Sequence, residues 1–172
     1  MNNLDFLKKR RSVRKFVADK PITDKQIKIL LEAASLAPSA GNRQSWFFYL
    51  VQDKKIKTKL TLAAFGQLFI TQAPLVIVAC ADLKRAAPYG KKGKELFAVQ
   101  DATLAIYNLW LAAVQMGLGA VWVGAFSQKL VAKILKLPKN LLPIAILPLG
   151  YPASLPKAHS RRPIKEIFRE IC

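Results

Sequence analysis

The sequence has few of the residues that build metal centres, disulfide frameworks and charge-relay triads. Its two cysteines are Cys80, inside an apolar run, and Cys172, the last residue, and its single histidine is His159. Cysteines placed in this way imply neither a disulfide framework nor a metal cluster. One histidine argues against a histidine-based metal site and against a Ser-His-Asp triad. The sequence also contains neither a GxGxxG fingerprint nor a P-loop.

Acidic residues are scarce as well. The chain holds 10 Asp and Glu against 28 Lys and Arg, for a net charge of +18, which predicts attraction to anionic ligands. The lysines are spread along the whole chain, whereas a nucleic-acid module gathers its charge on one face among aromatic residues. No specific nucleic-acid partner is therefore expected, although a non-enzymatic protein that binds polyanions stays an alternative. With 172 residues, 52% of them hydrophobic, the chain predicts one globular domain over residues 1–172.

Long hydrophobic runs are nearly absent. One uncharged run, residues 102–128, is long enough to imitate a membrane span. Two amides and three glycines interrupt it: Asn108, Gln115, Gly117, Gly119 and Gly124. These interruptions predict a buried helix followed by a strand, with no membrane as partner. Because the N-terminus shows no apolar signal sequence, a soluble cytoplasmic protein is expected.

Hydrophobic periodicity predicts four strands interspersed with helices, a layered domain of the α+β or α/β kind. Strands are expected at residues 46–51, 75–81, 120–126 and 142–149, and helices at residues 4–9, 23–37, 53–64, 97–116 and 129–135. Pro143 and Pro148 indicate that the last strand is an edge strand, or that they stand at its ends. Residues 82–94 predict a loop that is mobile and could cover a site.

Two of the predicted helices carry further information. Thr23 and Gln26 have the spacing of a capping box at the start of the second helix. The helix over residues 97–116 is apolar almost all round, which is typical of a helix that lies half in the core and half at a subunit interface. The sequence therefore predicts a dimer.

Two stretches are candidates for ligand binding. The first is the cationic stretch that holds Arg10, Arg11, Ser12 and Arg14, in which guanidinium groups can grip a phosphate and a hydroxyl can donate to it. A solvated basic face is the alternative. The second is the loop of small polar residues 38–45, which leads directly into an aromatic strand and could wrap a flat polar ligand. A plain helix-to-strand turn would use the same residue types.

Five segments in order resemble the nitroreductase family of FMN-dependent oxidoreductases, in its small single-domain form. They are RRSVRKF, LLEAASLAPSAGNRQSWFFYLV, APLVIVACAD, QDATLAIYNLWLAAVQMGLGAVWVGAF, and LGYP followed by SRRP. The likeness covers essentially the whole chain. It implies an α+β fold with a central mixed β-sheet flanked by helices and a long buried central helix. It also implies a homodimer with two FMN sites at the subunit interface.

The resemblance assigns site residues to both subunits. Those that match the FMN positions of one subunit are Arg10, Arg11, Ser12 and Arg14, with Arg161 beside Arg10 at the phosphate. Arg14 would lie by the pyrimidine edge of the flavin, where a fixed cation favours the anionic reduced form. Those that match the loop reaching across from the partner are Pro38, Ser39, Ala40 and Asn42. The third of these positions is often Ser in the family, so Ala40 implies one hydrogen bond fewer.

The remaining matches are spread along the second half of the chain. Gln67 corresponds to a residue at the ribityl chain or the ring edge. Val123, Gly124 and Ala125 correspond to a backbone segment that approaches the reactive edge of the ring, where a residue without a side chain allows close contact. His159 corresponds to a basic residue near the phosphate, and an ordinary surface histidine is the alternative.

The implied activity needs no acid-base side chain, because the flavin carries the chemistry. NAD(P)H would be a transient substrate that reduces FMN, and a nitroaromatic, quinone or related acceptor would then take its place in a ping-pong cycle. The absence of a dinucleotide fingerprint agrees with a transient nucleotide. The alternative is a specialised relative of the same fold, such as a flavin reductase, a dehydrogenase or a dehalogenase. The lack of large insertions favours a broad range of acceptors.

Overall fold

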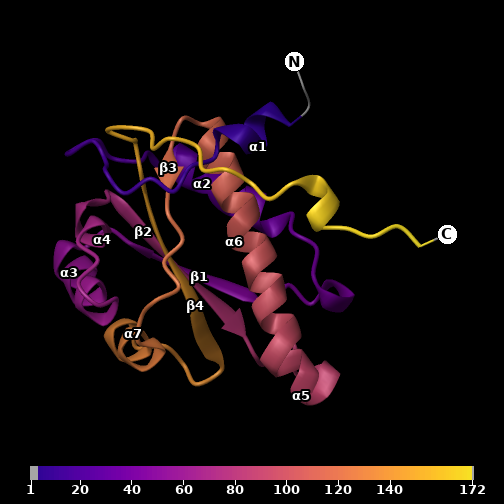
Figure 1. Ribbon diagram of the computed structural model, residues 1–172. Helices are drawn as coiled ribbons and strands as arrows, with labels where there is room; N and C mark the ends of the chain where they lie inside the picture. The colour runs from indigo at the N-terminus through magenta and orange to yellow at the C-terminus, as the bar shows by residue number, and fades with distance from the viewer. Residues whose placement is uncertain (1–3, 172) are drawn as a thin grey trace.

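The computed structural model describes residues 4–171, so Cys172 lies outside the described part of the chain. A four-stranded sheet forms its centre, in the order β1 (Trp46–Val51), β2 (Leu75–Asp82), β4 (Leu141–Gly150) and β3 (Gly119–Ala120) (Figure 1). Every pair of neighbouring strands is antiparallel. The expected mixed character of the sheet is limited to one isolated parallel bridge between Ser12 and Ala120. The predicted α+β class is confirmed.

Helices occupy most of the chain between the strands. They are α1 (Asp5–Lys9), α2 (Asp24–Ser35), α3 (Lys54–Ala63), α4 (Phe69–Gln72), α5 (Gly90–Lys92), α6 (Ala98–Gln115) and α7 (Gln128–Leu135). Short 3-10 helices occur at Ala40–Asn42, Ala87–Tyr89 and Ile164–Glu166, and a π-helical turn occurs at Gly93–Phe97. The predicted helices at these places are confirmed to within a few residues.

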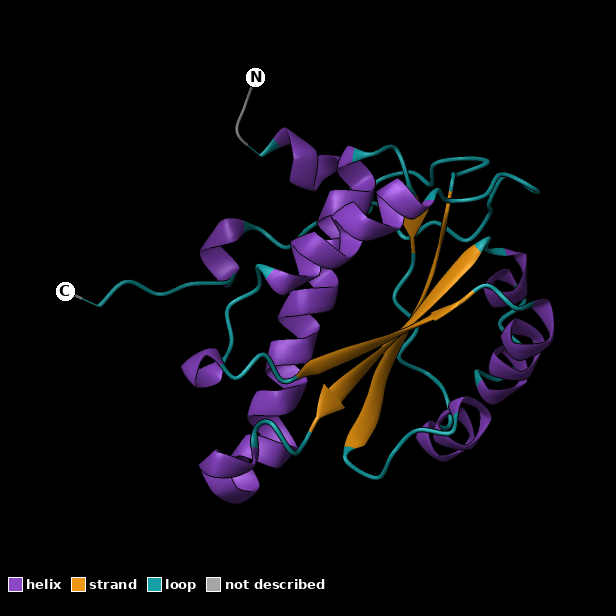
Figure 2. Ribbon diagram, turned by 180° about the vertical axis from the view of Figure 1, so that it is seen from behind, coloured by secondary structure: helices purple, strands orange, loops and turns teal. Residues whose placement is uncertain are grey.

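The strand β2 is buried on both faces, because a layer of helices covers each face of the sheet (Figures 1 and 2). Side chains alternate between the two faces of a strand. Leu75 and Ile77 pack with α2 and α6 on one face. Val76 and Val78 pack with α3, α4 and α7 on the other. The uninterrupted apolar sequence of this strand follows from its burial on both sides.

The long helix α6 is only partly buried, as the apolar sequence predicted. Ile106 and Leu109 are fully buried in the core, whereas Leu104 is 44% exposed and Tyr107 is 39% exposed. Among the described residues, the continuous helical stretch that ends with α6 is the one long and apolar enough to cross a membrane. Core helices pass the same test, and this one packs on α2 and the sheet. The run over residues 102–128 is a helix followed by β3, as expected.

The strand expected over residues 120–126 is much shorter in the structure. Beyond Ala120, the Val121 amide donates to the Pro148 carbonyl at 3.4 Å, but Pro148 has no N–H with which to donate in return. The ladder resumes only at Val123, which exchanges two hydrogen bonds with Ile146. Of the two alternatives for Pro143 and Pro148, the edge strand is wrong, since β4 lies between β2 and β3, although β3 pairs only with its last two residues. The prolines instead stand near the two ends of β4.

The loop expected over residues 82–94 is also largely helical. Turns follow β2, and the chain is then helical from Ala87 into α6. The glycines that indicated a loop include Gly93, whose backbone lies against Ala86. A Cβ atom at Gly93 would come within 2.2 Å of the Ala86 carbonyl oxygen. This glycine therefore allows close packing inside a helical segment rather than marking a loop.

The predicted capping box at α2 is present and gives a stability prediction. The Gln26 amide donates to the Thr23 hydroxyl at 3.3 Å, and the Thr23 amide donates to the Gln26 side chain at 3.0 Å. Thr23→Ala should lower the free energy of unfolding by about 1 kcal/mol, because one amide at the helix start loses its acceptor. Urea denaturation measures the change. As a control, Thr58→Ala removes an exposed hydroxyl that bonds only to its own helix, at the Lys54 carbonyl. An equal loss in both variants would contradict the capping role.

Candidate functional site

The cationic stretch is held against the short strand β3. Ser12 forms the parallel bridge with Ala120, and the Val13 amide donates to the Ala120 carbonyl at 2.9 Å. The Val13 side chain is buried beside Gly119, where an added Cβ would lie 2.6 Å from a Val13 methyl group. Because side chains alternate along extended chain, the inward Val13 leaves Ser12 and Arg14 on the opposite side. Local packing therefore fixes the direction of the cationic side chains.

Four of the expected site residues line one cleft of about 620 Å³: Arg10, Arg11, His159 and Arg161. The chain brings them together from its two ends, and Tyr107 of α6 lines the same cleft. The Arg10 guanidinium lies over the Trp110 ring, 4.8 Å from its centroid, so its position is supported by a cation–π contact. Within residues 4–171, Arg161 makes no hydrogen bond or ion pair. Three guanidinium groups and a histidine at one cleft form a donor set suited to a phosphate.

A second group of expected residues gathers beside the first. The Gln67 side chain donates to the Ala125 carbonyl at 3.1 Å and to the Ala64 carbonyl at 3.0 Å. It therefore ties the turn after α3 to residues 123–125. The Arg14 guanidinium lies 5.9 Å from the centre of the Phe69 ring, two residues beyond Gln67. The structure thus places Arg14, Gln67 and the 123–125 segment in one neighbourhood.

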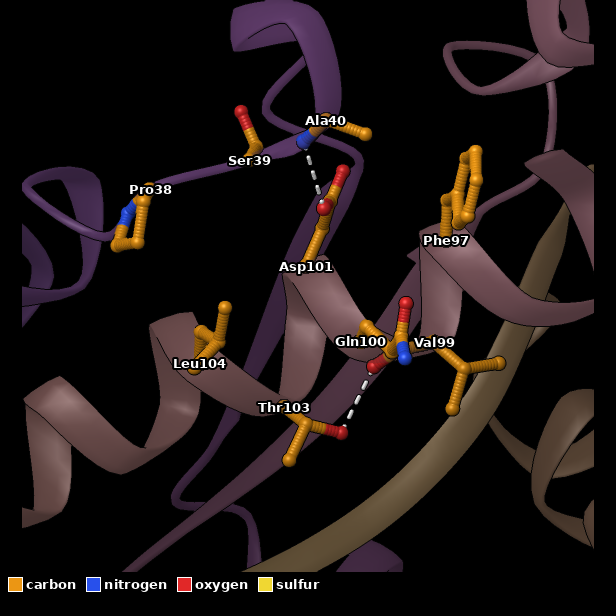
Figure 3. A pocket seen from close by; sticks show the side chains of 9 residues that line it. All are labelled: Pro38, Ser39, Ala40, Phe97, Val99, Gln100, Asp101, Thr103 and Leu104. Atoms are coloured by element: carbon orange, nitrogen blue, oxygen red, sulfur yellow. Dashed lines mark hydrogen bonds between the residues drawn. The ribbon is translucent and has the colours of Figure 1, made fainter. Parts of the chain in front are cut away.

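The expected partner loop lies elsewhere in the same chain. Pro38, Ser39 and Ala40 line a separate cavity of about 540 Å³ together with residues of α6, among them Asp101 and Leu104 (Figure 3). This cavity shares no lining residue with the cationic cleft. Both lie along α6, because Leu104 lines one and Tyr107, about one helical turn further on, lines the other. A single chain does not bring this loop to the Arg10 cleft.

The loop of residues 38–44, called the 38–44 loop below, has an internal hydrogen-bond network. The Gln44 amide donates to the Ser39 hydroxyl at 2.9 Å, and the Gln44 side chain donates to the Asn42 side chain at 3.1 Å. Asn42, one of the expected site residues, therefore helps to fix the shape of the loop. The loop is also attached to α6, since the Ala40 amide donates to the Asp101 carboxylate at 3.0 Å.

Phe69, Asp101 and Trp110 contact this region and were not among the expected site residues. For Asp101 the sequence did hold a signal. It is the one charged residue between Phe97 and Met116, in an otherwise apolar helix. Phe69 and Trp110 carry no comparable signal, because aromatic residues at helical spacing are expected in any core.

Other chemistries find little support in the structure. Among residues 4–171, no group of three or more His, Cys, Asp and Glu side chains could hold a metal ion. Burial raises the pKa of the Cys80 thiol to about 12, so the reactive thiolate is scarce at neutral pH. Cys80 is therefore a core residue and not a nucleophile.

Comparison with known proteins identifies the class. The family model described as Nitroreductase family matches residues 7–70 and 62–151. An Archaeoglobus fulgidus protein named for NADH dehydrogenase and NAD(P)H nitroreductase is 38% identical over 155 residues, covering 87% of this chain and 84% of that protein. A Bacillus subtilis protein named FMN reductase (NAD(P)H) is 34% identical over 168 residues, covering 89% and 67%.

Solved structures agree with the sequence matches. The Bacillus subtilis oxidoreductase YcnD superposes with a TM-score of 0.91 at 31% identity, covering 99% of this chain and 74% of that one. The NADPH:FMN oxidoreductase of Vibrio harveyi, in complex with NAD+, gives a TM-score of 0.90 at 29% identity, covering 99% and 77%. The chain belongs to the nitroreductase family.

The contact between Gly119 and Val13 gives a prediction for the site. Gly119→Ala should push Val13 outward and lower the free energy of unfolding by about 1–3 kcal/mol, because the added methyl group overpacks a buried contact. The Val13 amide should also exchange its hydrogen faster, since its bond to Ala120 is weakened. Urea denaturation and hydrogen exchange measure the two effects. Unchanged protection at Val13 would show that Gly119 does not position the cationic stretch.

Proposed function

We propose that the chain is an FMN-dependent NAD(P)H oxidoreductase that passes reducing equivalents to nitroaromatic, quinone or related acceptors. Family membership carries this proposal, together with relatives whose names specify an FMN reductase and an oxygen-insensitive NADPH nitroreductase. The residues that the family resemblance assigns to FMN form three groups: the cationic cleft, the group around Gln67, and the 38–44 loop. The first two suit different parts of that cofactor.

The cationic cleft suits the phosphate end of FMN. Arg10 and Arg161 present two guanidinium groups to the same cleft, and His159 adds a ring nitrogen. A flavin phosphate placed there would receive charge-assisted hydrogen bonds, which are stronger than neutral ones. Arg11 contributes less to a ligand, because its guanidinium already donates to the Lys8 and Arg10 carbonyls. Ser12, half-buried beside β3, follows Arg11 directly in the chain but does not line the cleft.

The group around Gln67 suits the ring end. When bound, FMN supplies the hydride-transfer chemistry, so the task of this group is to bind and orient it. Arg14, held near Phe69, provides a fixed positive charge. Gly124 leaves the backbone accessible, and the bond from Gln67 to Ala125 fixes that backbone in place. No side chain in this group is an acid-base catalyst.

The 38–44 loop completes the site from a second copy of the chain. This arrangement is supported by the separation of the loop from the Arg10 cleft within one chain. It is also supported by exposed apolar side chains, because such surfaces mark contacts with other molecules. All residues over 153–171 are exposed. Five of them are large and apolar: Leu155, Ile164, Ile167, Phe168 and Ile171.

A ping-pong order follows from one shared pocket. NAD(P)H binds and leaves before the acceptor enters, so neither substrate needs a dedicated nucleotide-binding fold. Reduction of free flavin is a second candidate activity, supported by relatives named FMN reductase. Turnover with free FMN, compared with turnover on a panel of quinones and nitroaromatics, separates the two activities.

The presence of FMN and the position of its phosphate can both be tested. The purified protein should be yellow and lose its colour with NADH or NADPH in the absence of oxygen. Arg10→Ala combined with Arg161→Ala should lose FMN and still yield a folded protein, because the donors removed lie at an open cleft. Lys15→Ala combined with Lys165→Ala is the matched control, since it removes the same charge from two exposed side chains. Equal loss of FMN in both variants would attribute binding to overall charge, and a colourless wild-type protein would contradict the proposed function.

A further prediction concerns the FMN site that two chains are proposed to share. A dimer should elute at about twice the 19.1 kDa of the chain. The arginine double variant and a loop variant, Ser39→Ala with Asn42→Ala, should each bind FMN poorly. Mixed dimers of the two should recover one intact site, because one chain supplies both arginines and the other supplies the loop. Absorbance of bound flavin in the isolated mixed dimer measures this recovery. No recovery would show that each site is built from one chain.

A further inference from the structure

The 38–44 loop has a backbone conformation that an isolated chain rarely adopts. Three of its residues have positive φ angles, Gly41 at 52°, Asn42 at 54° and Gln44 at 51°. Two of these are not glycine, so the left-handed conformation is sterically disfavoured for them. Such residues persist only where surrounding contacts fix them. The contacts that fix this loop therefore decide whether its shape exists before a ligand arrives.

One of these contacts comes from the core side of α6. Asp101 is 3% exposed, and its carboxylate accepts the Ala40 amide hydrogen at 3.0 Å (Figure 3). Ala40 is the first residue of the turn that contains Gly41 and Asn42. The hydrogen bond therefore attaches the start of the strained turn to a rigid helix.

Two further contacts come from the segment between β2 and α6. The Arg85 side chain donates to the Arg43 carbonyl at 2.6 Å. The Tyr89 hydroxyl lies against Gly41, where an added Cβ would be 2.0 Å from its oxygen. The loop is thus held at its start, middle and end by residues at least 40 positions away in the sequence.

The buried carboxylate of Asp101 has a cost in folding free energy, so a specific role for it has to be found. Burying a carboxylate among apolar neighbours disfavours folding, and a single hydrogen bond only partly offsets that cost. Among the described residues, the second carboxylate oxygen of Asp101 has no hydrogen-bond partner. A position required only for packing would hold an apolar side chain. What Asp101 provides and an apolar residue cannot is an acceptor for the Ala40 amide.

We propose that Asp101 is a positioning residue: its carboxylate holds the Ala40 amide and so preorganises the 38–44 loop for flavin. This inference rests on the proposed function, in which the loop forms part of the FMN site of the partner subunit. Asp101 makes no contact with the reacting atoms in this role. It lowers the conformational cost of binding, because the loop already has its bound shape.

The test compares two substitutions at one position. Asp101→Ala removes the acceptor and should weaken FMN binding about tenfold, the effect of losing one hydrogen bond to a neutral donor together with loop order. Asp101→Asn keeps an amide oxygen as acceptor and should bind FMN like the wild type. Titration of each apoprotein with FMN, followed by quenching of flavin fluorescence, gives the dissociation constants. Hydrogen exchange at Ala40 in the apoproteins should be accelerated only by Asp101→Ala.

Two further variants separate positioning from stability. Asp53→Ala is the matched control, because Asp53 also accepts one backbone amide, that of Ile56 at 2.8 Å, but at the start of α3. It should lower stability and leave FMN affinity unchanged. Arg85→Ala removes an exposed side chain that holds the other end of the loop, and it should also weaken FMN binding. This variant replaces Asp101→Ala in the titration if Asp101→Ala is too unstable.

The outcomes distinguish this inference from the proposed function. A wild-type apoprotein that takes up no FMN overturns the proposed function itself. If the wild type binds FMN, equal affinities in wild type and Asp101→Ala overturn the positioning role. Weak binding by Asp101→Asn as well as by Asp101→Ala also overturns it, because the amide oxygen still accepts from Ala40. Wild-type affinity in Asp101→Asn with loss in Asp101→Ala supports it.

Discussion

The pairing of β2 with β4 is the contact on which the rest of the structure depends. Each face of β2 packs against one layer of helices. Its partner β4 leads into residues 151–153, which bind the N-terminal segment. There the Val17 amide donates to the Tyr151 carbonyl at 2.8 Å, and the Ala153 amide donates to the Lys15 carbonyl at 3.0 Å. The cationic stretch and the C-terminal tail are therefore brought together by the end of one strand. Without that strand pair, Arg10 and Arg161 would have no common cleft.

Much of the fold could be predicted because its signals are local. The capping box at Thr23, the apolar run of β2 and the aromatic strand β1 depend on residues a few positions apart, and the structure confirms all three. Two errors arose where a residue acts through a distant partner. Pro148 interrupts the β3 ladder because it faces Val121, and Gly93 serves close packing against Ala86 inside a helix. Neither role can be read from spacing along the chain.

The candidate site shows the same division. Charged and small polar residues are visible in a sequence, so the cationic stretch and the 38–44 loop could be found there. The residues that hold them, Trp110 under Arg10 and Tyr89 against Gly41, are ordinary aromatic residues in sequence. Their roles come from contacts between segments that only folding brings together. Candidate binding residues are thus easier to recognise in a sequence than the residues that orient them.

In the proposed dimer, the helix α6 connects the arginine half of one FMN site with the loop half of the other. Asp101 holds the loop and Trp110 supports Arg10, nine positions and about 14 Å apart along the helix axis. Each residue of a helix turns the next by about 100°, so the helix sets a rotational phase between the two halves as well as a distance. Insertion of a single residue between Asp101 and Trp110 would change that rotation, so the loop and Arg10 would no longer face their present directions. The number of residues in this stretch of α6 is therefore far less free to change in evolution than the types of its exposed residues.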